Sequence, residues 1–150
     1  MTTLRLDQFL PYRLSIASNR VSAAVATAYQ ALFGLKIPEW RLIAVIAEGE
    51  AMTQQALCVR TQMDKVMVSR AAIALVDRGL LARRPNPEDQ RSHLLSLTRE
   101  GRALYESVAP KALELEARVF ADLSPDEINR FTAMLERIEA AATALDPERG

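Results

Sequence analysis

Apolar residues recur along the first part of the chain at the three- and four-residue steps of an amphipathic helix. Between about residues 7 and 33 they are Leu10, Leu14, Ala17, Val21, Ala24, Ala28 and Leu32. Gly34 follows directly and is a natural end for this helix. Pro38 suits the first turn of a second helix, which Gly49 ends. The pattern therefore predicts one long helix followed by a shorter one.

The middle of the chain predicts two more short helices and a strand pair. A third helix is expected to begin at Thr53, whose hydroxyl can cap it, and a fourth to span about residues 64–78. The apolar side of the fourth helix is expected to contain Val66, Ala72 or Ile73, and Val76. Residues 80–84 and 92–97 predict two strands, joined by a charged, turn-forming segment at 85–91.

The last third of the chain returns to a helical period. Thr98 starts a helix that Pro110 is expected to kink rather than end, because the apolar positions continue to Leu123. Ser124, Pro125 and Glu127 form a typical helix start. The final helix carries the apolar residues Ile128, Phe131, Leu135, Ile138, Ala142 and Leu145.

Composition narrows the class of protein. The length of 150 residues fits one domain, and the chain has one Cys and one His. That excludes an intrachain disulfide framework and a Cys/His zinc site. The sequence also has no glycine-rich phosphate loop and no nucleophile elbow, so we expect no enzyme, no cofactor and no metal. A secretory signal and a membrane-spanning run are not recognisable, and a cytoplasmic location is expected.

The charge is unevenly distributed along the chain. The formal net charge is zero, but residues 53–99 hold eight Lys or Arg against four Asp or Glu. Residues 100–150 hold six against eleven. A basic middle beside an acidic last third is compatible with a nucleic-acid partner for the middle segment.

Several short motifs then appear in a fixed order. They are Met52–Leu57, Asp64–Arg70, Asp77–Leu81, the D-x-R run Asp89–Arg91, and the L-x-L-T-x-x-G run Leu95–Gly101. Together they resemble the MarR (multiple antibiotic resistance regulator) family, over about residues 6–145. The resemblance implies a mostly α fold with a small β-wing. In it, a winged helix-turn-helix at about 38–98 lies between long dimerisation helices at about 7–33 and 98–146.

The resemblance implies double-stranded DNA as the partner, with a palindromic operator. An α-helix fits the major groove, and its N-terminal half usually meets the bases and phosphates. An arginine at the tip of a hairpin suits a narrow minor groove. The candidate DNA-binding residues are Thr53, Gln54, Lys65, Ser69, Arg70, Arg84 and Arg91. In the family, Asp89 is implied to pair with an arginine and orient the wing. Without the resemblance, these charges would fit a solvated surface equally well.

Two further expectations concern assembly and ligand. The stripes of the first and last helices are wider than one small domain can cover, which predicts a homodimer with a seam at Leu10, Leu14, Phe131, Leu135 and Ile138. The resemblance also implies release from DNA by a small aromatic acid or an aromatic acyl-CoA. The candidate ligand residues are Tyr12, Arg13, Trp40 and Arg41, each of which also has an ordinary role in packing or on the surface.

Two alternatives remain open at this point. Some members of the family sense hydroperoxides through a reactive thiol, and Cys58 is the only thiol here. Its place after Leu57 in the third predicted helix fits packing better, because a buried free Cys behaves as a small apolar side chain. A helical interaction protein that does not bind DNA would explain the long helices but not the wing.

Overall fold

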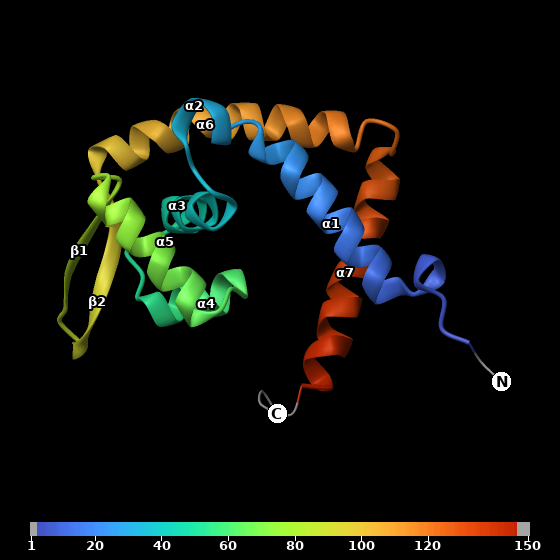
Figure 1. The fold of residues 1–150 in the computed structure, drawn as a ribbon, viewed down its shortest axis with the longest axis horizontal. Helices are drawn as coiled ribbons and strands as arrows, with labels where there is room; N and C mark the ends of the chain where they lie inside the picture. The colour runs from blue at the N-terminus through green and yellow to red at the C-terminus, as the bar shows by residue number, and fades with distance from the viewer. Residues whose placement is uncertain (1–2, 147–150) are drawn as a thin grey trace. The chain divides into compact units, whose positions relative to one another are not determined.

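The computed structural model describes residues 3–146, which are mostly helical and contain one two-stranded antiparallel sheet (Figure 1). The expected mostly α fold with a small β-wing is confirmed. The elements in chain order are the 3₁₀ turn η1 (Leu6–Gln8), α1 (Leu10–Ala26), α2 (Gln30–Phe33), α3 (Ile37–Glu48), α4 (Gln54–Thr61), α5 (Lys65–Asp77), β1 (Leu81–Asn86), β2 (Asp89–Leu97), α6 (Arg99–Val119) and α7 (Pro125–Ala144).

The chain forms two compact units, each defined by the contacts within it. The boundary between them along the sequence falls inside α6, after Leu115. The first unit holds the elements from η1 to most of α6, and the second holds the last turn of α6 together with α7. Among residues 3–146, no helix has both the length and the apolar character needed to cross a membrane.

The single long helix predicted for residues 7–33 is wrong, because the chain forms three separate pieces there. After Ala26 the N–H groups of Ala28 and Tyr29 donate to carbonyls only three residues back, at 3.0 Å each, which tightens and ends α1. Tyr29 then leaves the helical conformation, and its side chain is buried in the core. Gly34, at φ +62°, ends α2 in the left-handed conformation that glycine favours.

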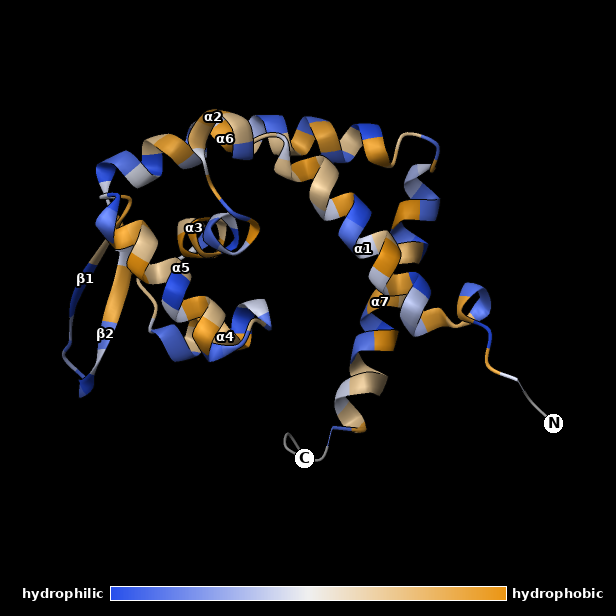
Figure 2. Ribbon diagram, viewed as in Figure 1, coloured by the Kyte–Doolittle hydropathy of each residue, from blue (hydrophilic) through white to orange (hydrophobic). Residues whose placement is uncertain are grey.

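The core of the first unit lies between α3, α4, α5 and the hairpin. Its fully buried side chains include Leu42, Ile43, Leu57, Val68, Leu75, Leu81 and Leu95. The wing is tied to the helices through Met52, which exchanges two backbone hydrogen bonds with Leu95 at 3.0 and 2.8 Å. Figure 2 shows that α3, α4 and α5 carry both hydrophobic and hydrophilic residues, and only the hydrophobic side of each packs into the core.

Helix α5 buries a different face from the one predicted. Its buried residues are Val68, Ala71, Ala72 and Leu75, a spacing that places them on one side of a helix. The expectation was right for Ala72, and Val76 is half-buried against the core. It was wrong for Val66 and Ile73, which are 58% and 50% exposed.

The strands of the wing are longer than predicted and the turn between them is shorter. Pairing runs from Leu81 opposite Leu97 to Pro85 opposite His93, with an irregularity after Pro85. Asn86 holds the tip: its side-chain N–H donates to Ser92 Oγ at 3.0 Å, and its side-chain oxygen accepts from the Glu88 N–H at 3.1 Å. These bonds let the hairpin extend through most of the segment expected to be a loop.

The two helices predicted at the end of the chain are present, and α6 ends at Val119, short of the Leu123 to which its apolar period was expected to continue. Helix α6 continues through Pro110, and α7 begins with a capping box in which the Ser124 and Glu127 side chains each bond the other residue's backbone N–H. In the second unit the rings of Phe120 and Phe131 lie 6.4 Å apart between centroids.

Candidate nucleic-acid interface

Helix α5 presents the predicted contact residues at its N-terminal half. Gln62 takes the left-handed conformation, at φ +58°, and turns the chain from α4 into α5. Asp64 then caps α5, because its Oδ1 accepts the Met67 N–H at 2.8 Å. Lys65 and Arg70 are exposed and Ser69 is half-buried, so these polar groups are available at the surface.

The start of α4 and the wing enclose a hollow of about 430 Å³. Thr53 caps α4 through its Oγ1, which accepts the Ala56 N–H at 3.1 Å, and Gln54 follows as the first helical residue. Four predicted residues come together here: Thr53, Gln54, Asp89 and Arg91. The hollow is also lined by residues that the site prediction did not include: Gln55, Arg83, Asn86, Ser92, His93 and Leu95.

Arg83, rather than its neighbour Arg84, faces this hollow. Arg83 pairs with Leu95 and Arg84 with Leu94, and successive residues of a strand point to opposite faces. Arg84 is exposed and does not line the hollow. The period-two alternation with the buried Leu81 is the sequence signal that could have selected Arg83.

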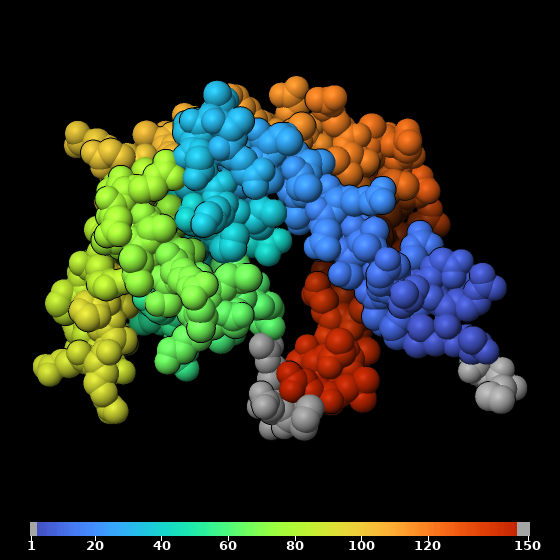
Figure 3. All heavy atoms as spheres, viewed as in Figure 1, coloured from blue at the N-terminus to red at the C-terminus, as the bar shows by residue number. Residues whose placement is uncertain are grey.

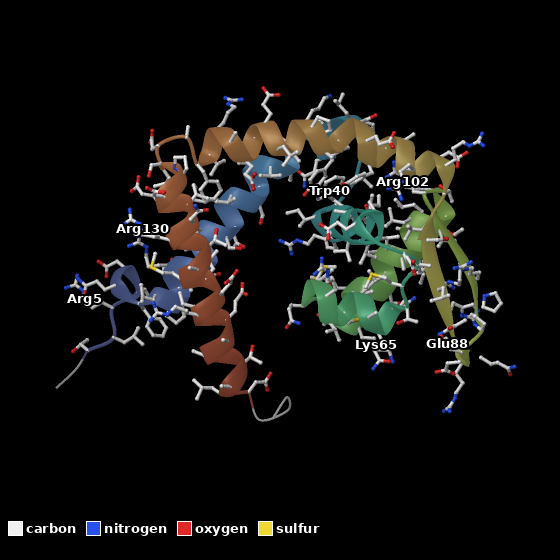
Figure 4. All side chains as sticks on the ribbon, turned by 180° about the vertical axis from the view of Figure 1, so that it is seen from behind. Arg5, Trp40, Lys65, Glu88, Arg102 and Arg130 are labelled. Carbon is white, nitrogen blue, oxygen red and sulfur yellow. The ribbon has the colours of Figure 1, made fainter. Side chains whose placement is uncertain are left out.

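The tip of the wing places one arginine almost wholly in solvent, beside an aspartate. Asp89 Oδ1 accepts the backbone N–H of Arg91 at 3.0 Å and lies 3.8 Å from its Nε. The Arg91 side chain is nonetheless 97% exposed. The hairpin, yellow-green in Figure 3, projects from the surface. In Figure 4, Lys65 at the start of α5 and Glu88 at the hairpin tip lie on the same edge of the first unit. One partner surface can therefore contact both α5 and the hairpin.

The predicted ligand residue Trp40 is engaged in packing. Its ring stacks between those of Tyr29 and Tyr105, with centroids 5.3 and 5.8 Å apart. Burial raises the pKa of Tyr29 above the ordinary value, and the nearby Arg41 charge opposes that rise in part. Neither tyrosine was singled out from the sequence, because the stack joins a turn, α3 and α6.

The other three ligand candidates, Tyr12, Arg13 and Arg41, are not part of this ring stack. The Arg13 guanidinium donates to the Asp7 carbonyl at 3.2 Å, and Tyr12 is 41% exposed. Arg41 is exposed on α3. Within residues 3–146, no hydrogen bond or ring contact joins Tyr12 or Arg13 to Trp40 or Arg41.

The remaining candidates concern assembly and the thiol. Leu10 and Leu14 of α1 are 71% and 41% exposed, and Phe131 and Ile138 of α7 are 38% and 47% exposed. Leu135 is half-buried and lines a hollow of about 420 Å³ within the second unit, together with Phe120, Ile128 and Phe131. Cys58 is half-buried and packs against the core of the first unit.

Comparison with known proteins finds similarity to transcriptional regulators. A model of the MarR family matches residues 33–92. The crystal structure of a probable transcriptional regulator from Pseudomonas aeruginosa is 30% identical, with a TM-score of 0.78, over 89% of this chain and 99% of that one. The homoprotocatechuate degradative operon repressor of Escherichia coli is 26% identical over 68% of this chain and 69% of its own length. CouR from Rhodococcus jostii, solved with p-coumaroyl-CoA bound, has a TM-score of 0.78 at 23% identity over 91% of this chain and 95% of that one.

Proposed function

The chain belongs to the MarR family, whose members are transcriptional regulators and not enzymes, and from that premise we propose that it is a homodimeric DNA-binding repressor. Residues of about 38–98 read a palindromic operator. Residues of about 7–33 and 98–146 join the two copies. A small aromatic acid or an aromatic acyl-CoA releases the DNA.

One observation carries the DNA-binding part of this proposal. Three features belong to one compact unit: the exposed N-terminal half of α5, the capped start of α4 and the solvent-exposed Arg91 at the wing tip. The first suits a major groove, the second suits a phosphate because helix N-termini attract anions, and the third suits the adjacent minor groove. The excess of Lys and Arg in residues 53–99 has the sign that a phosphate backbone requires.

Exposed apolar side chains support the dimer. Leu10 on α1 and Ile138 on α7 leave much of their surface in water in a single chain. A second copy would remove that surface from water, and a two-fold axis would set two α5 helices about one DNA turn apart. The operator would then be an imperfect palindrome.

The effector part of the proposal rests on relatives. The E. coli relative is the repressor of a homoprotocatechuate degradative operon, and CouR was solved with p-coumaroyl-CoA. Of the four candidate residues, Arg13 and Arg41 offer guanidinium groups that suit a carboxylate or phosphate. A ligand releases DNA only to the extent that it binds the DNA-incompetent state more tightly.

A gel shift with the DNA upstream of the protein's own gene tests both parts. We expect a retarded band that benzoate, a hydroxybenzoate, a cinnamate or one of their CoA esters abolishes, and that ligand should also raise the melting temperature. The absence of a retarded band at low salt would contradict the DNA-binding proposal. A retarded band that no member of the panel affects would contradict the aromatic effector alone.

A further inference from the structure

The outward ridge of α5 is apolar where a DNA-reading helix is usually polar. Val68, Ala71, Ala72 and Leu75 define the buried side of the helix. Val66, Arg70 and Ile73 follow one another at steps of four and three residues and lie on the opposite side. Val66 is 58% exposed and Ile73 is 50% exposed. Two branched aliphatic side chains therefore stand in water on the surface that faces away from the core.

We propose that Val66 is a specificity-determining residue that packs against the 5-methyl group of a thymine in each half-site. The inference rests on the proposed DNA-binding function and adds a base preference to it. In the major groove, thymine is the one base that presents a methyl group, and an aliphatic side chain is its natural partner. Removing both apolar surfaces from water favours the contact.

The position of Val66 along α5 suits such a contact better than that of Ile73. Val66 is the second residue of the helix, and the N-terminal residues of a recognition helix are the ones that meet base edges. Ile73 lies two turns further on, beside the end where Asp77 would face the phosphates with a like charge. The first turn is therefore the part of α5 expected to enter the groove.

The charges around Val66 fit a nucleic-acid partner. Val66 borders a hollow of about 340 Å³ whose lining includes the cations Lys36 and Arg70, and Lys65 precedes it in the chain. Two carboxylates also line this hollow, but both accept backbone N–H groups at helix starts. Glu39 accepts from Lys36 N–H at 2.9 Å, and Asp64 accepts from Met67 N–H at 2.8 Å. An apolar contact flanked by cations is complementary to a base methyl between two phosphate strands.

The test removes the 5-methyl group of the thymine and, separately, the two γ-methyl groups of Val66. Duplexes enriched by the wild-type chain from a random-sequence pool would be remade with each thymine replaced in turn by deoxyuridine, which lacks only the 5-methyl group. We expect one thymine in each half-site at which this replacement lowers wild-type affinity about fourfold, as for the loss of one buried methyl group. Val66→Ala is expected to lose a similar factor on the thymine duplex. It should then bind the thymine and deoxyuridine duplexes equally well.

Ile73→Ala is the matched control, because it shortens a similarly exposed aliphatic side chain on the same ridge and should keep the fourfold difference. A thermal melt checks that both variants fold. The inference is overturned if no thymine is sensitive, or if Val66→Ala keeps the same sensitivity as the wild type; in either case the DNA-binding proposal stands. If the wild type enriches no duplex, the proposed function itself fails.

Discussion

Gly101 allows the first turn of α6 to lie directly against the backbone of Leu80. A Cβ placed at Gly101 would overlap the Leu80 carbonyl oxygen, and it would also press on the Leu97 side chain at 3.1 Å. Thr98 fixes the same junction, because its hydroxyl donates to the Gly79 carbonyl at 2.6 Å and accepts the Gly101 N–H at 3.0 Å. The T-x-x-G motif is thus a packing device that joins the wing to α6.

Gly101→Ala is therefore expected to destabilise the protein by about 2 kcal/mol and to lower the melting temperature by roughly 4–8 °C. Gly49→Ala serves as the control, since a Cβ at Gly49 meets nothing within 4 Å and its φ is not positive. Thermal unfolding followed by circular dichroism measures both variants. Equal melting temperatures for the two would contradict the packing explanation.

Arg91 has the most exposed charged side chain among the ion pairs that the structure describes, so its removal should not affect folding. Arg91→Ala is expected to weaken DNA binding with little change in base preference. The slope of log K against log salt should fall by about one unit, because one fewer counterion is released. Fluorescence anisotropy over a salt series measures the slope. Gln90→Ala, an exposed neutral neighbour, should leave it unchanged; an unchanged slope for Arg91→Ala would mean that the wing is not at the DNA.

Among the elements, α5 depends most directly on its cap. Asp64→Ala removes the acceptor for the Met67 N–H and is expected to cost about 1 kcal/mol of unfolding free energy. It should also weaken DNA binding, because the first turn of α5 would fray. Asp64→Asn keeps an acceptor oxygen and should retain most of the stability. Denaturant titrations measure the unfolding free energy of both variants. If Asp64→Asn loses as much stability as Asp64→Ala, the negative charge of Asp64 and not its capping hydrogen bond stabilises α5.

Local signals were sufficient to predict the elements that begin with a cap or a turn motif. Thr53 and Ser124 cap helices where expected, and Gly34 ends one. The break after α1 and the buried face of α5 depend instead on tertiary contacts. The break after Ala26 cannot be found from spacing, because the apolar period continues through it while Tyr29 turns toward Trp40. The face of α5 was ambiguous for a related reason: apolar residues occur on both sides of the helix, and only packing against α3 and α4 selects one.

The candidate site was predicted in its main parts but not in its details. The motifs located Lys65, Arg70, Thr53 and Arg91 on two helix starts and a hairpin tip, which lie within one unit. Which arginine of β1 faces the hollow depends on which side of the strand packs against the core, and the burial of Leu81 selects the side of Arg83. The effector came from the family resemblance and the ligand candidates from their side-chain chemistry, which does not show that Trp40 stacks between two tyrosines.

At the scale of the whole molecule, the apolar face of α7 is expected to hold two copies together. Phe131 and Ile138 lie about two turns apart on that face and are partly exposed. The double substitution Phe131→Asp with Ile138→Asp places charges where the seam is predicted, and the chain should become monomeric at micromolar concentration. Light scattering reports the mass.

Ala140→Asp is the control for this experiment, because Ala140 is exposed on the opposite side of α7 and a charge there should leave the dimer intact. A wild-type chain that is already monomeric at micromolar concentration would contradict the predicted seam. A double variant that stays dimeric would place the seam elsewhere on the chain.

The central claim is that two copies of this chain bind one duplex. Sedimentation velocity of the protein mixed with a labelled duplex, either the upstream region of its own gene or one enriched from a random pool, measures this stoichiometry directly. The account predicts a single complex of two chains per duplex that dissociates as salt is raised. Protein and DNA that sediment separately at low salt, or a complex with one chain per duplex, would contradict it.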